Sequence, residues 1–124
     1  MPMTKKKIYI SYDFANDRAF KNELVAASQG EGANFKIANW SMKPENINAK
    51  TLKEIKFHIS KCDALVILVG ENTATSESVK QELDLAKALD KPIIPLLAHP
   101  QNTPPQGAGE AHDWSPKTLS ELLK

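Results

Sequence analysis

The chain has 124 residues, 41% hydrophobic and 25% charged, which is typical of one globular domain. Its net charge of +1 argues against a nucleic-acid partner, and its single cysteine excludes an internal disulfide. No run of about 20 apolar residues suits a membrane span, and no apolar stretch follows the N-terminal lysines as in a signal peptide. We therefore expect a single cytoplasmic domain over residues 1–124, with no membrane partner.

Apolar segments of strand type alternate with segments of helical periodicity along the chain. Residues 64–69 form a continuous apolar run, as in a central parallel strand that helices cover on both faces. Residues 35–38 alternate like an outer strand, and Pro95 removes a backbone donor, which favours a place near a sheet edge or an interrupted pairing. The predicted strands are 8–11, 35–38, 64–69 and 92–97, and the predicted helices are 17–28, 47–61, 75–89 and 116–123.

The C-terminal part contains a long segment rich in proline and glycine. Residues 98–115 predict a long loop, and a short edge strand near residues 110–113 fits within it. Ser115 and Pro116 suit the N-cap and the first position of the last helix. Alternating strands and helices imply right-handed crossovers. We therefore expect an α/β fold, a flavodoxin-like three-layer α/β/α sandwich with a mostly parallel sheet of four or five strands, order 2-1-3-4-5.

In such sheets, ligands bind beyond the carboxyl ends of the strands, where the strand order reverses. The turns after the first three strands are therefore the predicted binding region. The polar turn at residues 11–13 also suits helix capping by Asp13 or Asn16, and Trp40 either stacks on a nicotinamide or adenine ring or covers the end of the core. The predicted substrate-binding residues are Ser11, Tyr12, Asp13, Asn39, Trp40, Ser41, Gly70, Glu71 and Asn72.

Glu82 is the most informative residue of the predicted third helix. Val79, Leu83, Ala86 and Leu89 define the apolar stripe of that helix, and Glu82 falls inside the stripe. A carboxylate on a core-facing surface is costly unless it is paired or faces a cavity. Two interpretations stay open. Glu82 is either a functional carboxylate in a cleft or a residue at the edge of the stripe that reaches water or a lysine.

A carboxylate in a partly buried cleft suits the cleavage of a sugar C–N bond, because positive charge develops on the ribose in the transition state. Several other chemistries lose support. The chain has no GxGxxG, P-loop, HExxH or GxSxG motif and no metal-ligand spacing, so we predict no metal site. The third strand ends without the aspartate of a receiver-type phosphorylation site. Cys62 is expected to be a buried small hydrophobic residue.

Five segments carry a family resemblance through their order and spacing. They are Ile8–Asp13, Ile37–Ser41, Ser76–Leu83, Lys91–Pro95 and His112–Trp114. Together they resemble the TIR-like family, and most closely the small TIR-like proteins of the Thoeris anti-phage defence type. Asn39 stands where that branch often has an aspartate. Glu77-Ser78-Val79 replaces the Trp-Cys that ordinary TIR domains often carry before their Glu-Leu pair.

The resemblance implies cleavage of NAD at the nicotinamide–ribose bond, with Glu82 as the catalytic glutamate, NAD as substrate and no separate cofactor. In Thoeris systems the product resembles a cyclic ADP-ribose signal that activates an effector protein, and TIR-type activity commonly depends on self-association. Two alternatives stay open. One is a non-catalytic TIR-like module that works by assembly. The other is a further flavodoxin-like nucleotide enzyme, such as a nucleoside deoxyribosyltransferase-like transferase.

Overall fold

The computed structural model describes residues 6–13, 16–30, 33–40 and 48–123. Its elements are, in chain order, β1 (Lys6–Ser11), α1 (Arg18–Ser28), β2 (Phe35–Trp40), α2 (Ala49–Ser60), β3 (Ala64–Val69), the short 3-10 helix η2 (Thr73–Thr75), α3 (Glu77–Ala88), β4 (Ile93–Leu97), β5 (His112–Asp113) and α4 (Pro116–Leu122). The strands form one sheet in the order β2-β1-β3-β4-β5, and every neighbouring pair is parallel. The predicted strand order is confirmed.

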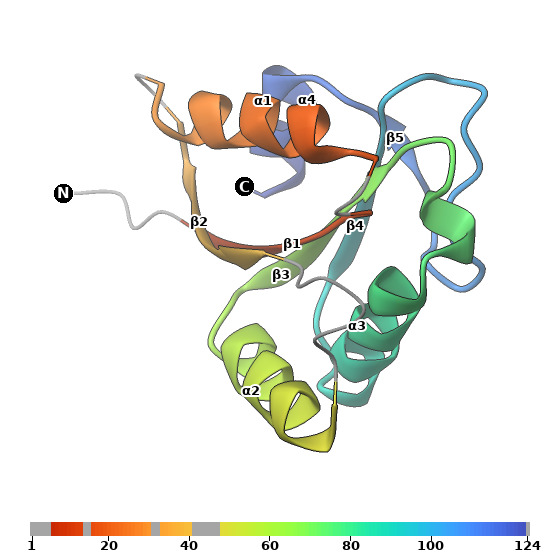
Figure 1. Cartoon of the computed structure of the whole chain (residues 1–124). Coiled ribbons are helices and arrows are strands. Elements are labelled where there is room, and N and C mark those ends of the chain that lie inside the picture. The colour runs from red at the N-terminus through yellow and green to blue at the C-terminus, as the bar shows by residue number, and fades with distance from the viewer. Residues whose placement is uncertain (1–5, 14–15, 31–32, 41–47, 124) are drawn as a thin grey trace, which may run out of the picture.

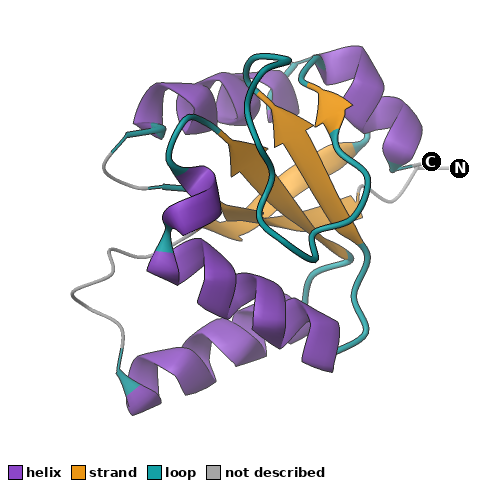
Figure 2. Cartoon of the chain, turned by 90° about the vertical axis from the view of Figure 1, so that its right-hand side faces the viewer, coloured by secondary structure: helices purple, strands orange, loops and turns teal. Residues whose placement is uncertain are grey.

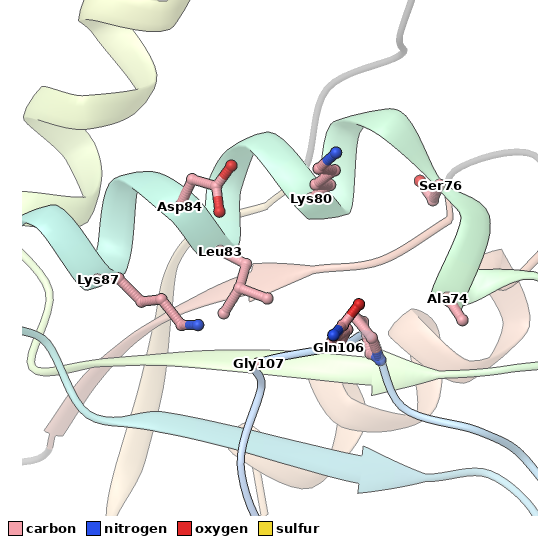
Figure 3. A pocket seen from close by; sticks show the side chains of 9 residues that line it. Ala74, Ser76, Lys80, Leu83, Asp84, Lys87, Gln106 and Gly107 are labelled. Atoms are coloured by element: carbon pink, nitrogen blue, oxygen red, sulfur yellow. The ribbon is translucent and has the colours of Figure 1, made fainter.

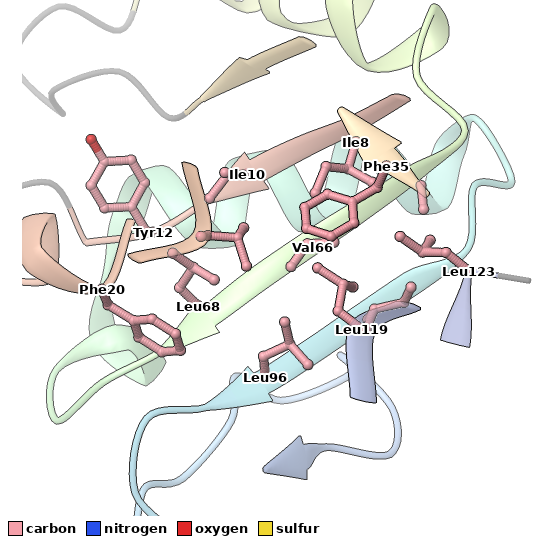
Figure 4. Packing of buried hydrophobic residues seen from close by; sticks show 13 residues of the cluster. Ile8, Ile10, Tyr12, Phe20, Phe35, Val66, Leu68, Leu96, Leu119 and Leu123 are labelled. Carbon is pink, nitrogen blue, oxygen red and sulfur yellow. The ribbon is translucent and has the colours of Figure 1, made fainter. Parts of the chain in front are cut away.

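Helices cover both faces of the sheet, as the three-layer prediction requires. In Figure 1, α1 and α4 lie above the strands, and α2 and α3 lie below them. Figure 2, a view turned by 90°, shows the same separation of helices by the sheet. Because side chains alternate along a strand, Ile8 and Ile10 point into the core under α1 and α4, while Tyr9 points toward α2 and α3. Each face therefore has its own hydrophobic cluster, and Figure 4 shows the first of them.

The burial of the strands follows their place in the sheet. All six residues of β3 are buried, as predicted for a central strand covered on both faces. β2 lies at an edge, also as predicted. β4 pairs with β3 along its whole length, but β5 pairs only with Leu96 and Leu97. Among the described residues, no strand pairs with the outer side of β4 at Pro95, so the missing backbone donor of this proline breaks no hydrogen bond of the sheet.

The helix boundaries follow capping residues. Ser115 Oγ accepts a hydrogen bond from the Thr118 N–H at 3.0 Å, as expected for the N-cap of α4. Asn48 caps α2 in the same manner, with Oδ1 3.0 Å from the Thr51 nitrogen, so the helix begins two residues later than predicted. The third helix also begins later, because Ser76 caps α3 after the short turn of η2.

α1 begins shortly after the polar turn that follows β1. Its N-cap is Asp17, and this side chain makes no capping hydrogen bond. Within the preceding turn, the Asp13 carboxylate accepts a hydrogen bond from the side-chain amide of Asn16 at 2.6 Å, and capping by these two residues stays a prediction. Among the described helices, none is long and apolar enough to cross a membrane.

Candidate functional site

Glu82 lies in the middle of α3, on the face that packs against the sheet. Its neighbours Val79, Leu83 and Ala86 are buried with it, and Glu82 itself has an exposed fraction of 0%. The Ser11 hydroxyl donates a hydrogen bond to Glu82 Oε1 at 2.9 Å, and the Tyr9 hydroxyl donates one to Glu82 Oε2. The carboxylate is therefore inside the stripe rather than at its edge.

The two hydroxyl donors come from one face of β1. Tyr9 and Ser11 are two residues apart on the strand, so both side chains point toward α3. A buried carboxylate is costly unless donors satisfy it, and these hydroxyls supply hydrogen bonds to both of its oxygens. Burial raises the pKa of Tyr9, and the nearby charge of Glu82 and their hydrogen bond raise it further. The proton therefore stays on Tyr9 as a donor to Glu82.

Tyr9 was not among the predicted site residues. A tyrosine in an apolar strand is read most simply as a core residue, and Tyr9 is indeed buried in the cluster under α2 and α3. The alternation of side chains along a strand was the signal that could have identified Tyr9. Once Ser11 is placed in the site, the residue two positions earlier lies on the same face of β1.

An irregularity brings the end of β2 beside Tyr9. The parallel register between β1 and β2 shifts after Ile8, which pairs with Ile37, so that Tyr9 pairs with Asn39 and Ile10 with Trp40. Bulges of this kind re-aim the residues that follow them and often occur next to active sites. The side chains of Asn39 and Trp40, and all of Ser41, lie outside the described residues, so their binding roles stay predictions.

A separate cavity of about 290 Å³ lies at the carboxyl ends of the strands, between the start of α1 and the segment that follows β4. It brings together the three predicted residues that follow β3. Its lining residues are Asn16, Asp17, Gly70, Glu71, Asn72, Ala98, His99 and Asn102. Asn102 is held in place because its side-chain amide donates to the carbonyl of Val69 at 3.0 Å.

Gly70 is required at the rim of this cavity because Asp17 packs directly against it. A Cβ atom at position 70 would lie 2.1 Å from Asp17 Oδ1, which is far inside contact distance. Thr73 joins the two segments, because its hydroxyl accepts from the Gly70 N–H at 2.7 Å and lies 3.1 Å from Asp17 Oδ2. Burial raises the pKa of Asp17; the Thr73 hydrogen bond opposes this shift, and the charges of Asp13 and Glu71 add to it.

The fold thus separates the predicted binding residues. Ser11 lies between β1 and α3, where it contacts Glu82, whereas Gly70, Glu71 and Asn72 line the cavity near α1. Tyr12 is buried in the cluster under α1 and α4 (Figure 4), and burial also raises its pKa. Asp17 was missed by the sequence reasoning, which treated it only as the first residue of a helix.

Comparison with known families shows to which family this fold belongs. The chain matches the family model of the TIR-like domain of the Thoeris protein ThsB over residues 9–103. The chain belongs to this family. The matched region of this ThsB-type TIR-like domain begins at Tyr9 and contains Glu82 and the cavity at the carboxyl ends of the strands, whereas β5 and α4 lie beyond it.

Two solved structures are similar to this TIR-like domain. One is the CMP N-glycosidase BcmB of Clostridium botulinum, with 22% identity and a TM-score of 0.51 over 74% of this chain and 71% of that chain. The other is the TIR domains of the activated Roq1 resistosome, which directly recognises the pathogen effector XopQ. That match has 16% identity and a TM-score of 0.53 over 75% of this chain and 57% of that chain. At these identities the likenesses show the fold. No curated protein matches the chain.

Proposed function

We propose that this TIR-like domain cleaves the bond between nicotinamide and ribose in NAD, with Glu82 as the catalytic carboxylate. The observation that carries the proposal is a completely buried glutamate held by the hydroxyls of Tyr9 and Ser11 at the carboxyl end of β1. Membership of the Thoeris ThsB family supports it. The resemblance of Ser76–Leu83 to the helix that carries the catalytic glutamate of NAD-cleaving TIR domains also implies this role for Glu82.

The chemistry follows from the charge that develops on the sugar. When the C–N bond breaks, its electron pair leaves with the nicotinamide nitrogen, and the ribose carbon becomes oxocarbenium-like. The negative charge of Glu82 stabilises this cation, and hydrogen bonds from Ser11 and Tyr9 favour the charged form of the carboxylate. Attack of water on the ribose carbon, with loss of a proton, gives ADP-ribose. Attack by a nitrogen of the adenine ring gives a cyclic product.

Access to Glu82 sets a condition on activity. The carboxylate has no exposed surface in this arrangement, so substrate can reach it only after the groups around it move. We propose that self-association of the domain brings about this opening, and that a cyclic ADP-ribose-type product then acts as the signal for an effector protein in cytoplasmic anti-phage defence.

The test is mass spectrometry of NAD incubated with concentrated purified protein. We expect the wild type to release nicotinamide, and Glu82→Gln to reduce the rate at least about 100-fold, as for loss of a general catalytic group. Glu77→Gln is the matched control, because it removes an exposed carboxylate from the same helix and should keep the activity. A Glu82→Gln protein that turns over NAD as fast as the wild type would sink the assignment.

Cleavage of a smaller nucleotide is the second candidate, and it rests on the fold shared with the CMP N-glycosidase. The same assay with CMP and with free nucleosides separates the two, because cytosine release without nicotinamide release favours the second. A protein that turns over none of these substrates at any concentration, yet self-associates, would instead support the non-catalytic assembly module.

A further inference from the structure

A larger cavity lies beside α3, on the flank of the helix that faces residues 105–107. Its volume is about 470 Å³, within the range of about 300–1,000 Å³ that small-molecule sites occupy. Figure 3 shows it between the helix and the segment at residues 105–107. Lys80, Asp84 and Lys87 line it from one side of α3, and at about 100° per residue Glu82 points to the opposite side. This cavity is therefore separate from the site proposed for NAD cleavage.

Two lysines give the cavity its charge. Lys80 and Lys87 are two helical turns apart, so they lie along one line of α3. Within the described residues, neither ammonium group has an ion pair or a side-chain hydrogen bond. Asp84 lies one turn from each lysine and also lines the cavity, and the three charged side chains leave an excess of one positive charge. The lining thus offers two cations to an anionic ligand.

The wall of the cavity opposite α3, at residues 105–107, lies close to Lys87. Gly107 has a φ of +85°, and a Cβ atom there would lie 2.3 Å from Lys87 Nζ. This φ favours glycine, because residues with a side chain rarely adopt it, and Figure 3 shows Lys87 reaching from α3 toward Gly107. The next residue, Ala108, is buried in the cluster that contains Leu83, which fixes this wall against the helix.

We propose that this cavity binds a ligand with two linked phosphate groups, of the kind found in a nucleoside diphosphate. The Cα atoms of Lys80 and Lys87 are about 10 Å apart along the helix axis, at about 1.5 Å per residue. Two lysines on one line of the helix supply one cation for each of the two phosphates. Lysine binds phosphate as a point charge, and the amide of Gln106 adds a hydrogen-bonding group. The remaining volume accommodates the nucleoside.

Isothermal titration calorimetry at low ionic strength tests this site with pyrophosphate, ADP, inorganic phosphate and adenosine. We expect saturable binding of one ADP or one pyrophosphate per chain, with adenosine and inorganic phosphate at least about tenfold weaker. Replacing both cations, in K80Q/K87Q, should weaken ADP binding at least about tenfold. The matched control is K53Q/K56Q, which removes two exposed lysines from α2 and should leave the affinity unchanged. Removing the competing anion, in Asp84→Asn, should strengthen binding.

Other outcomes would overturn the proposal. Equal losses of ADP affinity in the two double variants would mean that ADP binding depends only on the net charge of the protein. Adenosine binding as tightly as ADP, or inorganic phosphate as tightly as pyrophosphate, would contradict recognition of two linked phosphates. A wild type without saturable ADP or pyrophosphate binding would contradict the site itself. Circular dichroism of every variant checks that these exposed substitutions leave the fold unchanged.

Discussion

The hydroxyl of Tyr9 in β1 donates a hydrogen bond to the carboxylate of Glu82 in α3, although 73 positions separate them in the chain. Both residues are buried, so the contact lies where the hydrogen bond is not shared with bulk water. It joins β1, the strand between β2 and β3, to the helix that carries the proposed catalytic group. This pairing has consequences for stability as well as for chemistry.

Replacing Tyr9 with phenylalanine should destabilise the protein by about 2 kcal/mol, as for loss of a hydrogen bond to a charged group. Phenylalanine keeps the ring in its hydrophobic cluster, so the loss of stability measures the contribution of the hydroxyl. Urea unfolding measures it, and the cycle of Tyr9→Phe, Glu82→Gln and the double variant isolates the pairwise term. If the two single effects simply add, the hydroxyl and the carboxylate are not coupled.

The close contact between Gly70 and Asp17 predicts that a larger residue at position 70 destabilises the protein. It also predicts that a smaller residue at position 17 restores the lost stability. Gly70→Ala places a Cβ atom 2.1 Å from Asp17 Oδ1, so overpacking should cost about 1–3 kcal/mol. Asp17→Ala removes the carboxylate that the new methyl group meets, and the double variant should recover most of that loss. Thermal unfolding of the single and double variants is the measurement. A Gly70→Ala protein as stable as the wild type would show that the neighbouring segments shift freely.

Asp17 should make stability depend on pH. Its pKa is raised above the ordinary 3.8, first by burial, so ionising it costs more in the folded than in the unfolded chain. Its contribution to stability is therefore complete below about pH 4 and is lost as the pH rises through the folded pKa. Asp17→Asn cannot ionise, so it should melt at a higher temperature than the wild type at pH 7.5. The difference should shrink at pH 3.5; a constant difference would contradict the shift.

Cys62 should resist thiol reagents while the protein is folded. Its exposed fraction is 2%, and its pKa is raised to about 11, mainly by burial and also by the charge of Asp63. At pH 8 the reactive thiolate is therefore scarce and covered. Labelling with a colorimetric disulfide reagent should be at least about 100-fold slower than in denaturant. Rapid labelling of the folded protein would mean that the end of α2 opens easily.

Much of the fold could be predicted from local patterns. The apolar run at residues 64–69 indicated a central strand, and its bounds agree with β3 because burial on both faces leaves no polar residue in the run. Ser115 marked the start of α4 because an N-cap acts within its own helix. The strand order followed from the alternation of strands and helices, since right-handed crossovers leave few arrangements. The starts of α2 and α3 were less accurate, because the caps Asn48 and Ser76 were not recognised.

The sequence by itself placed Glu82 within the apolar stripe of its helix, because helical periodicity is a local property of the residues around it, but it left open whether the side chain is buried or reaches water at the edge of the stripe. Only the tertiary structure decided what surrounds that carboxylate. Ser11 and Tyr9 meet Glu82, whereas Tyr12 is buried under the helices on the other face of the sheet. Contacts between a strand and a distant helix depend on packing, which local spacing does not encode. The residue that most sharpened the candidate site was therefore Tyr9, which the sequence placed in the core and the fold placed against Glu82.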